Sequence, residues 1–234
     1  MSREVGAIQD EGGFQVVSAV MQLLQGQAKR WSSLDGMLDK LKAFAISDSL
    51  VISMPWQSSV AATALITAMH GFQYEMLLRA GHLLRGFMTR GKLFHVDQFV
   101  FGEGLVRAYN KEIGLKGGPP RIVLDPQLIE FALARGADSP PVGVSSAFNL
   151  LRRDPRDGKW FIDYLKPVGV LEKESPDKLR VERKQVRQWV RERAVIYQDE
   201  QSIAEKYAWL AEYEKSTRAE FLSLLQTREK EPIG

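Results

Sequence analysis

Two aspartates, Asp10 and Asp48, are of the residue type that could hold a divalent cation beside a phosphate group. Mg²⁺ and Mn²⁺ prefer oxygen ligands, and paired carboxylates supply them. Asp10 precedes Gly13-Phe14, where a helical pattern begins. Glycine lets the backbone approach a phosphate there, and the first turn of a helix directs unpaired N–H groups toward it. Asp48, taken alone, has the local pattern of an ordinary turn residue.

The secondary-structure elements expected around Asp10 and Asp48 are compatible with a pair of carboxylates that hold a metal ion. Residues 4–9 predict a short strand, and residues 14–31 predict a helix with apolar residues on one face. Residues 41–53 contain two β-rich runs broken at Ser47-Asp48, which predicts a hairpin with Asp48 in its turn. The interval between the aspartates therefore accommodates one helix and a connection back to a neighbouring strand.

The rest of the chain predicts a mixed fold. Turn residues and proline-glycine breaks separate the expected elements: a buried helix from 58 to 79, strands at 83–90 and 93–101, a helix at 102–113, a strand at 121–124, a helix opened by Asp125-Pro126, a strand at 160–165, and two helices between 176 and 227 that meet near 197–201. This order favours the α/β (α+β) class, with a mixed, largely antiparallel sheet, packed helices and C-terminal helices.

Composition narrows the function classes. The chain has 234 residues, enough for one sizeable domain or one domain with an appendage. It has no cysteine, which excludes disulfides, thiolate metal sites and a cysteine nucleophile. The net charge of +3 is too small to indicate nucleic acid as the main partner. Because no signal pattern or membrane-spanning run is found, we expect a cytoplasmic protein without a membrane partner.

Cationic side chains mark two further regions. Arg85 follows an apolar run and precedes Gly86, where its guanidinium could bind a phosphate or pair with a carboxylate; both remain open. Lys92, with Arg90, follows in the next turn and could also contact a phosphate. Residues 178–193 carry an excess of Lys and Arg, which favours the solvated face of a helix over a phosphate- or nucleic-acid-binding face, because an apolar stripe runs through them.

The segment LRGFMTRGKLFHVDQFVFGEGLVRAYNKE at 84–112 resembles part of a class III-like nucleotide cyclase domain. Its glycine spacing and the Gly-x-x-Leu-Val-x-Ala-Tyr pattern at 102–109 are similar to the bacterial Pycsar-type pyrimidine (uridylate or cytidylate) cyclases of anti-phage defence. Downstream segments such as RIVLDPQLIE extend the resemblance over about residues 7–214.

The resemblance implies a ferredoxin-like cyclase homology domain at 1–170 and a C-terminal helical extension at 171–234. It also implies that Asp10 and Asp48 hold two Mg²⁺ or Mn²⁺ ions. The 3′-hydroxyl of UTP or CTP then attacks the α-phosphorus, and pyrophosphate leaves. Arg85 joins the aspartates as a candidate catalytic residue. The candidate substrate-binding residues are Gly13, Phe14, Lys42, Phe44 and Lys92.

Base selection in this family is expected from the strand before the second aspartate. Lys42 could donate to a pyrimidine carbonyl, and Phe44 could narrow the pocket to one ring, although alternating strand residues are usually core and surface. Purine cyclases carry Asn and Arg where this chain has Val106 and Asn110, which argues against an adenylate cyclase. Glu11, beside Asp10, could substitute as a ligand.

The resemblance further implies a head-to-tail homodimer with shared active sites. It implies a cyclic nucleotide product that activates a separate effector during phage infection. The sequence does not decide whether uracil or cytosine is the preferred base. Two other functions stay open: a catalytically degenerate cyclase-like domain that binds a nucleotide or a partner, and a nucleic-acid-binding protein that uses residues 178–193.

Overall fold

A computed structural model of the chain describes residues 41–46, 49–56, 59–96, 99–130, 149–166 and 176–230. The strand expected at 4–9, the helix expected at 14–31 and the domain boundary expected at 170/171 lie outside these residues. The chain divides into two compact units. The first takes its described residues from 1–72, 89–109 and 125–149, and the second from 73–88, 110–124 and 150–234.

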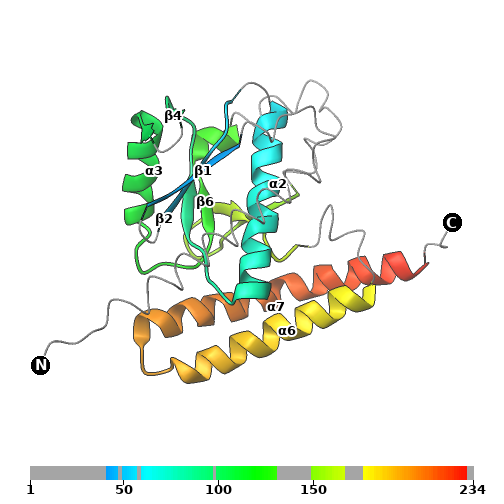
Figure 1. Ribbon diagram of the computed structural model, residues 1–234. Coiled ribbons are helices and arrows are strands. Elements are labelled where there is room, and N and C mark those ends of the chain that lie inside the picture. The colour runs from blue at the N-terminus through cyan, green and yellow to red at the C-terminus, as the bar shows by residue number, and fades with distance from the viewer. Residues whose placement is uncertain are drawn as a thin grey trace, which may run out of the picture. The chain divides into compact units, whose positions relative to one another are not determined.

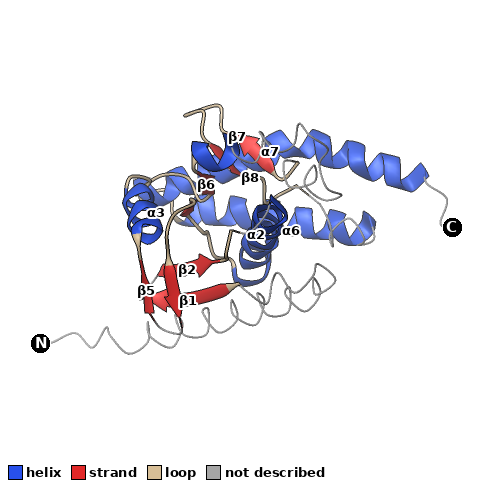
Figure 2. Ribbon diagram, turned by 90° about the horizontal axis from the view of Figure 1, so that it is seen from above, coloured by secondary structure: helices blue, strands red, loops and turns tan. Residues whose placement is uncertain are grey.

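The first unit contains two antiparallel hairpins (Figures 1 and 2). Strands β1 (Lys42–Ile46) and β2 (Ser49–Ser53) pair from Lys42↔Ser53 to Ile46↔Ser49, which confirms the hairpin expected there. This register leaves residues 47 and 48 as the connection, and both lie outside the described residues.

The single strand expected at 93–101 is wrong, because the structure has a hairpin there. Strand β4 (Phe94–Val96) pairs antiparallel with β5 (Phe99–Phe101), in a register that runs from Phe94↔Phe101 to Val96↔Phe99. The polar pair Asp97-Gln98 interrupts the apolar run. Aspartate is a favoured turn residue, so this interruption was the signal for a reversal of the chain.

The second unit contains a four-stranded mixed sheet in the order β3-β6-β8-β7. Strand β3 (Gly86–Met88) runs parallel to β6 (Ile122–Leu124), and β8 (Trp160–Ile162) runs antiparallel to both β6 and β7 (Leu151–Arg153). The expected α+β class with mixed and antiparallel sheets is therefore confirmed. Strand β7 was not expected, since Leu-Arg-Arg carries little β signal.

The helices follow the expected positions closely. Helix α2 (Ser59–Glu75) continues into one π-helical turn, η2 (Met76–Ala80), which ends at Gly81 with a φ of 63°. Helix α3 (Glu103–Ile113) confirms the helix expected at 102–113. No helix in the described parts of the chain is long and apolar enough to cross a membrane.

Helices α6 (Pro176–Ile196) and α7 (Gln201–Lys230) lie side by side in the second unit (Figure 1). The apolar stripe expected in α6 is buried at Leu179, Val186 and Val190, while most of its charged residues are exposed. This confirms the expectation of a helix with one packed and one solvated face.

Helix α7 packs on the sheet through aromatic side chains. The Phe161 ring of β8 meets Trp209 and Tyr213 edge-on, with ring centroids 5.5 and 5.3 Å apart. The Tyr213 hydroxyl donates to Asp163 at 2.5 Å and accepts from the backbone N–H of Leu165 at 3.0 Å. The C-terminal helices thus complete the core of the second unit.

Candidate active site

Four of the expected site residues, Asp10, Gly13, Phe14 and Asp48, lie outside the described residues. Asp48 is nevertheless bracketed by strands in register, because Ile46 pairs with Ser49. The hairpin predicted from sequence is therefore present on both sides of the candidate metal ligand.

Lys42 joins the two hairpins of the first unit. Its ammonium group donates to the carbonyl oxygen of His95, with Nζ and O 2.6 Å apart, and the residue is exposed. Phe44 is half-buried and lies on the same face of β1, two residues further along. Lys42 therefore has a structural partner on β4.

His95 lies on the inward face of β4 and is buried. Its Nδ1 and the Ser53 Oγ are 2.6 Å apart and share a hydrogen bond. Burial, assisted by the positive charge of Lys42, lowers the pKa of His95 from its ordinary value. The His95 imidazole thus links β2 to β4 through an internal hydrogen bond.

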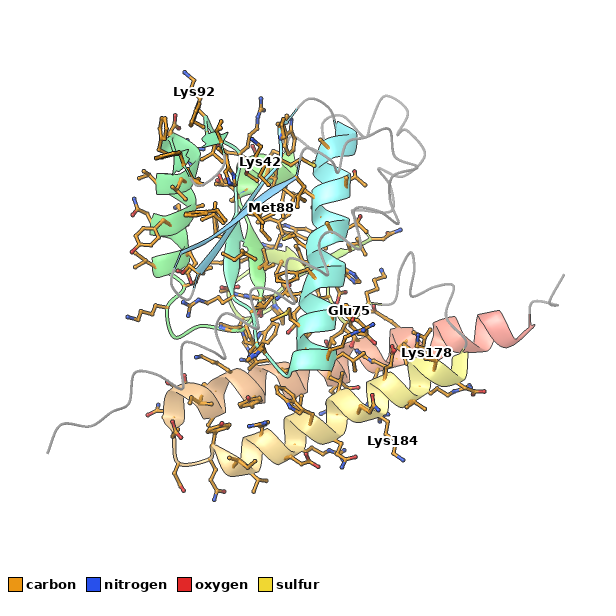
Figure 3. All side chains as sticks on the ribbon, in the orientation of Figure 1. Lys42, Glu75, Met88, Lys92, Lys178 and Lys184 are labelled. Carbon is orange, nitrogen blue, oxygen red and sulfur yellow. The ribbon has the colours of Figure 1, made fainter. Side chains whose placement is uncertain are left out.

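Lys92 lies where a loop approaches the start of α3. The N–H of Gly104 donates to the Lys92 carbonyl oxygen at 2.9 Å, and the Lys92 side chain is exposed (Figure 3). Backbones meet so closely here that a Cβ on Gly91 would lie 2.6 Å from the Gly104 Cα. At Gly102, whose φ is 139°, a Cβ would lie 2.5 Å from the Lys92 carbonyl oxygen. These glycines therefore position Lys92 at the N-terminal end of α3.

We expect Gly91→Ala to destabilise the fold by about 1–3 kcal/mol, the usual cost of forcing an extra carbon into a packed contact. The added Cβ meets backbone atoms of Gly104, which cannot rotate away as a side chain would. Urea unfolding of the variant and the unchanged protein measures the difference. Gly86→Ala is the matched control, because its Cβ would meet only Ile122 side-chain atoms at 3.6 Å or more. Equal stability of the two variants would contradict the close approach.

Arg85 pairs with a carboxylate, one of the two roles that the sequence left open. Its Nε and Nη2 both donate to Oε1 of Glu112, at 2.8 and 2.6 Å. Both residues belong to the second unit, whereas Lys42, Phe44 and Lys92 belong to the first. Within its own unit, Arg85 links the start of β3 to α3.

The two cationic residues near the middle and end of α3, Arg107 and Lys111, differ in their surroundings. Arg107 is held by Glu103, one turn earlier, and donates to the Arg90 carbonyl oxygen at 3.2 Å. Val106, Asn110 and Lys111 are exposed. Arg107 is therefore held by partners on α3 and in the preceding loop, whereas Lys111 extends from an exposed position.

An apolar face on the β4–β5 hairpin was missed at the sequence level. Phe94, Val96, Phe99 and Phe101 are exposed, and Phe99 keeps 71% of its surface. Phe94 and Phe101 stack across the strands with ring centroids 4.7 Å apart. Had the break at Asp97-Gln98 been taken as a turn, the alternation of side chains would have placed all four residues on one face.

Comparison of the chain with protein-family models, with curated proteins and with solved structures found no match. Across the described ranges, no cluster of three or more histidine, aspartate or glutamate side chains could hold a metal ion. The candidate metal ligands themselves fall outside those ranges.

Proposed function

We propose that the chain is a nucleotide cyclase that converts UTP, or CTP, to the 3′,5′-cyclic monophosphate and pyrophosphate. The observation that carries the proposal is the pairing of β1 with β2, which leaves Ser47-Asp48 as a hairpin connection downstream of the Asp10-x-x-Gly13-Phe14 motif. The resemblance of residues 84–112 to the cyclases adds the strand, glycine and helix pattern around Lys92.

Asp10 and Asp48 would hold the divalent ions, because their carboxylate oxygens are the donors that Mg²⁺ and Mn²⁺ prefer. When bound, such ions lower the pKa of the ribose 3′-hydroxyl and neutralise phosphate charge. Gly13 and the helix that follows it would bind the phosphates through backbone N–H groups. Lys92, exposed at the start of α3, would contribute a further positive charge, and positioning of this kind accounts for much of the rate in enzymes.

Lys42 and Phe44 would contact the base. Lys42 can donate to a carbonyl acceptor that both pyrimidines carry, and Phe44 limits the pocket to one ring. A pocket that hydrogen-bonds its substrate discriminates far more strongly than one that selects by size, which alone gives roughly 10–200-fold. We therefore expect pyrimidine triphosphates to be preferred over ATP and GTP, with UTP ahead of CTP.

The test is incubation of the purified chain with Mn²⁺ and an equimolar mixture of the four nucleoside triphosphates, followed by mass spectrometry of the products. Cyclic UMP or cyclic CMP is expected in excess. Equal turnover of ATP or GTP would contradict the pyrimidine preference. Absence of every cyclic product, with nucleotide still bound, would support the degenerate cyclase-like domain, which the Arg85–Glu112 ion pair favours.

The proposal includes a homodimer with shared sites, whose product would activate a separate effector. The exposed β4–β5 face supports a self-associating surface, because contiguous apolar patches of this kind mark interaction sites.

We expect Phe99→Glu with Phe101→Glu to weaken self-association by about a hundredfold or more, since each buried phenylalanine contributes about 1.5–3 kcal/mol and about 1.4 kcal/mol is tenfold. Sedimentation velocity over a range of concentrations measures this change. Val181→Glu, on an exposed residue of α6, is the control and should leave association unchanged. A monomer at concentrations where the enzyme turns over would contradict the shared site.

A further inference from the structure

A pocket of about 290 Å³ opens between the two C-terminal helices, within the second unit. Four of its residues recur on one face of α6 and four on one face of α7. These are Arg180, Arg183, Lys184, Arg187, Glu214, Arg218, Phe221 and Leu222. Figure 3 labels Lys184, which extends from the α6 side.

Positive charge in this pocket exceeds negative charge. Five Lys or Arg side chains line it, and Glu214 is the one acidic residue of the lining, although Arg180 also pairs with Asp177 outside the lining at 3.1 Å. The Glu214 carboxylate is 2.7 Å from Arg218, 3.6 Å from Arg187 and 3.8 Å from Arg183. A single carboxylate therefore lies near three guanidinium groups, and its one negative charge balances only one of their three positive charges.

Arg183, at the base of this charge cluster, has hydrogen-bonding capacity left over. Its side chain is only 3% exposed. Nη2 donates to Thr217 Oγ1 at 2.6 Å and Nη1 to the Leu165 carbonyl oxygen at 3.3 Å, but Nε is buried without a partner among the described residues. The Nε atom of Arg218 is also buried and also has no partner among the described residues. Burial lowers the pKa of Arg183, and Glu214 opposes this effect.

Unpaired buried donors on a cation are costly, and an anionic oxygen is the group that would satisfy them. Guanidinium forks match phosphate geometry, which explains why arginine is common where phosphates bind. We propose that the α6–α7 pocket binds a small phosphate-bearing anion, such as a diphosphate, independently of the cyclase activity.

The size and setting of the pocket favour a small ligand over a nucleic acid. Ligand pockets usually measure about 300–1,000 Å³, so this one suits a compact group. Phe221, which is nearly buried, and Leu222 form an apolar wall on the α7 side. Acidic residues also interrupt the basic run of α6 at Glu182 and Glu192, whereas a nucleic-acid footprint needs a continuous basic stripe.

The test is calorimetric titration of the full chain with inorganic pyrophosphate in EDTA, which removes metal-dependent binding elsewhere. Saturable binding is expected. Lys184→Gln with Arg187→Gln should weaken it about tenfold or more, since a hydrogen bond to a charged group is worth about 1.5–3 kcal/mol. The control, Arg191→Gln with Lys206→Gln, also removes one arginine and one lysine charge, from positions on α6 and α7 outside the pocket, and should change the affinity less than about twofold.

Circular dichroism confirms that the variants are folded, and Arg218→Gln provides a second, single-site variant on α7. Binding must survive Asp48→Ala, which separates this proposal from the proposed cyclase site. No saturation, or equal weakening by the pocket and control variants, would overturn the pocket. The proposal would also be overturned if random-sequence DNA bound more tightly than pyrophosphate and the pocket variant, but not the control, lost that binding. The ligand would then be a nucleic acid.

Discussion

Asp48→Ala should lower the rate of UTP cyclisation by at least about a hundredfold, because charge stabilisation through a bound metal is worth several kcal/mol and each 1.36 kcal/mol is tenfold in rate. The fold should be nearly unchanged, since the strands on either side of the connection pair through their own backbones. Mass spectrometry of cyclic UMP formed over time measures the rate, and circular dichroism checks the fold.

The matched control is Asp199→Ala, which removes an exposed aspartate from the connection between α6 and α7 and should retain full turnover. Asp10→Ala should behave as Asp48→Ala does. If Asp10→Ala is active while Glu11→Ala is inactive, the metal ligand is shifted by one position. Near-normal turnover by a folded Asp48→Ala protein would show that the two-metal proposal is wrong.

Asp154→Ala should destabilise the chain by about 3–5 kcal/mol, the cost of breaking a buried ion pair by removing one partner. Asp154 is 2% exposed, pairs with Arg121 and accepts from Trp209 Nε1 at 2.8 Å. The Arg121 guanidinium also lies 5.6 Å from the Phe161 ring centroid and 5.9 Å from that of Trp209. Without this carboxylate, the buried Arg121 guanidinium loses one of its two carboxylate partners, and the Trp209 indole N–H loses its hydrogen-bond acceptor.

Urea unfolding measures the change, and Asp157→Ala is the matched control. Asp157 binds the same Arg121 through Nη2 at 2.5 Å, but its side chain is 32% exposed. Solvent screens a half-exposed carboxylate more than a buried one, so the control should lose clearly less stability than Asp154→Ala. Equal losses from the two variants would show that burial of Asp154 contributes nothing to its effect.

Local features of the fold followed from the sequence alone. The β1–β2 hairpin and α3 lie where turn residues and periodicity predicted them. Asp125 caps a helix as expected: its Oδ1 accepts from the N–H of Gln127 at 3.1 Å, and its carbonyl oxygen accepts from Leu128. Such features depend on residues a few positions apart, and for that reason a single sequence reveals them.

Only the tertiary structure decided which distant partners the charged residues meet. The sequence left Arg85 open between a phosphate and a carboxylate, and the fold brings Glu112 to it from 27 positions away. The sequence likewise suggested a solvated basic face on α6. In the structure, however, Arg183 of this helix is buried, and residues of α6 and α7 together line a cationic pocket that contains Glu214. The sequence alone determined the β1–β2 hairpin and most of the helices, and it indicated the candidate chemistry of Asp10 and Asp48, because propensity and residue type act locally; it did not determine the β4–β5 hairpin or β7. Pairing and burial depend on long-range packing, which no local pattern encodes.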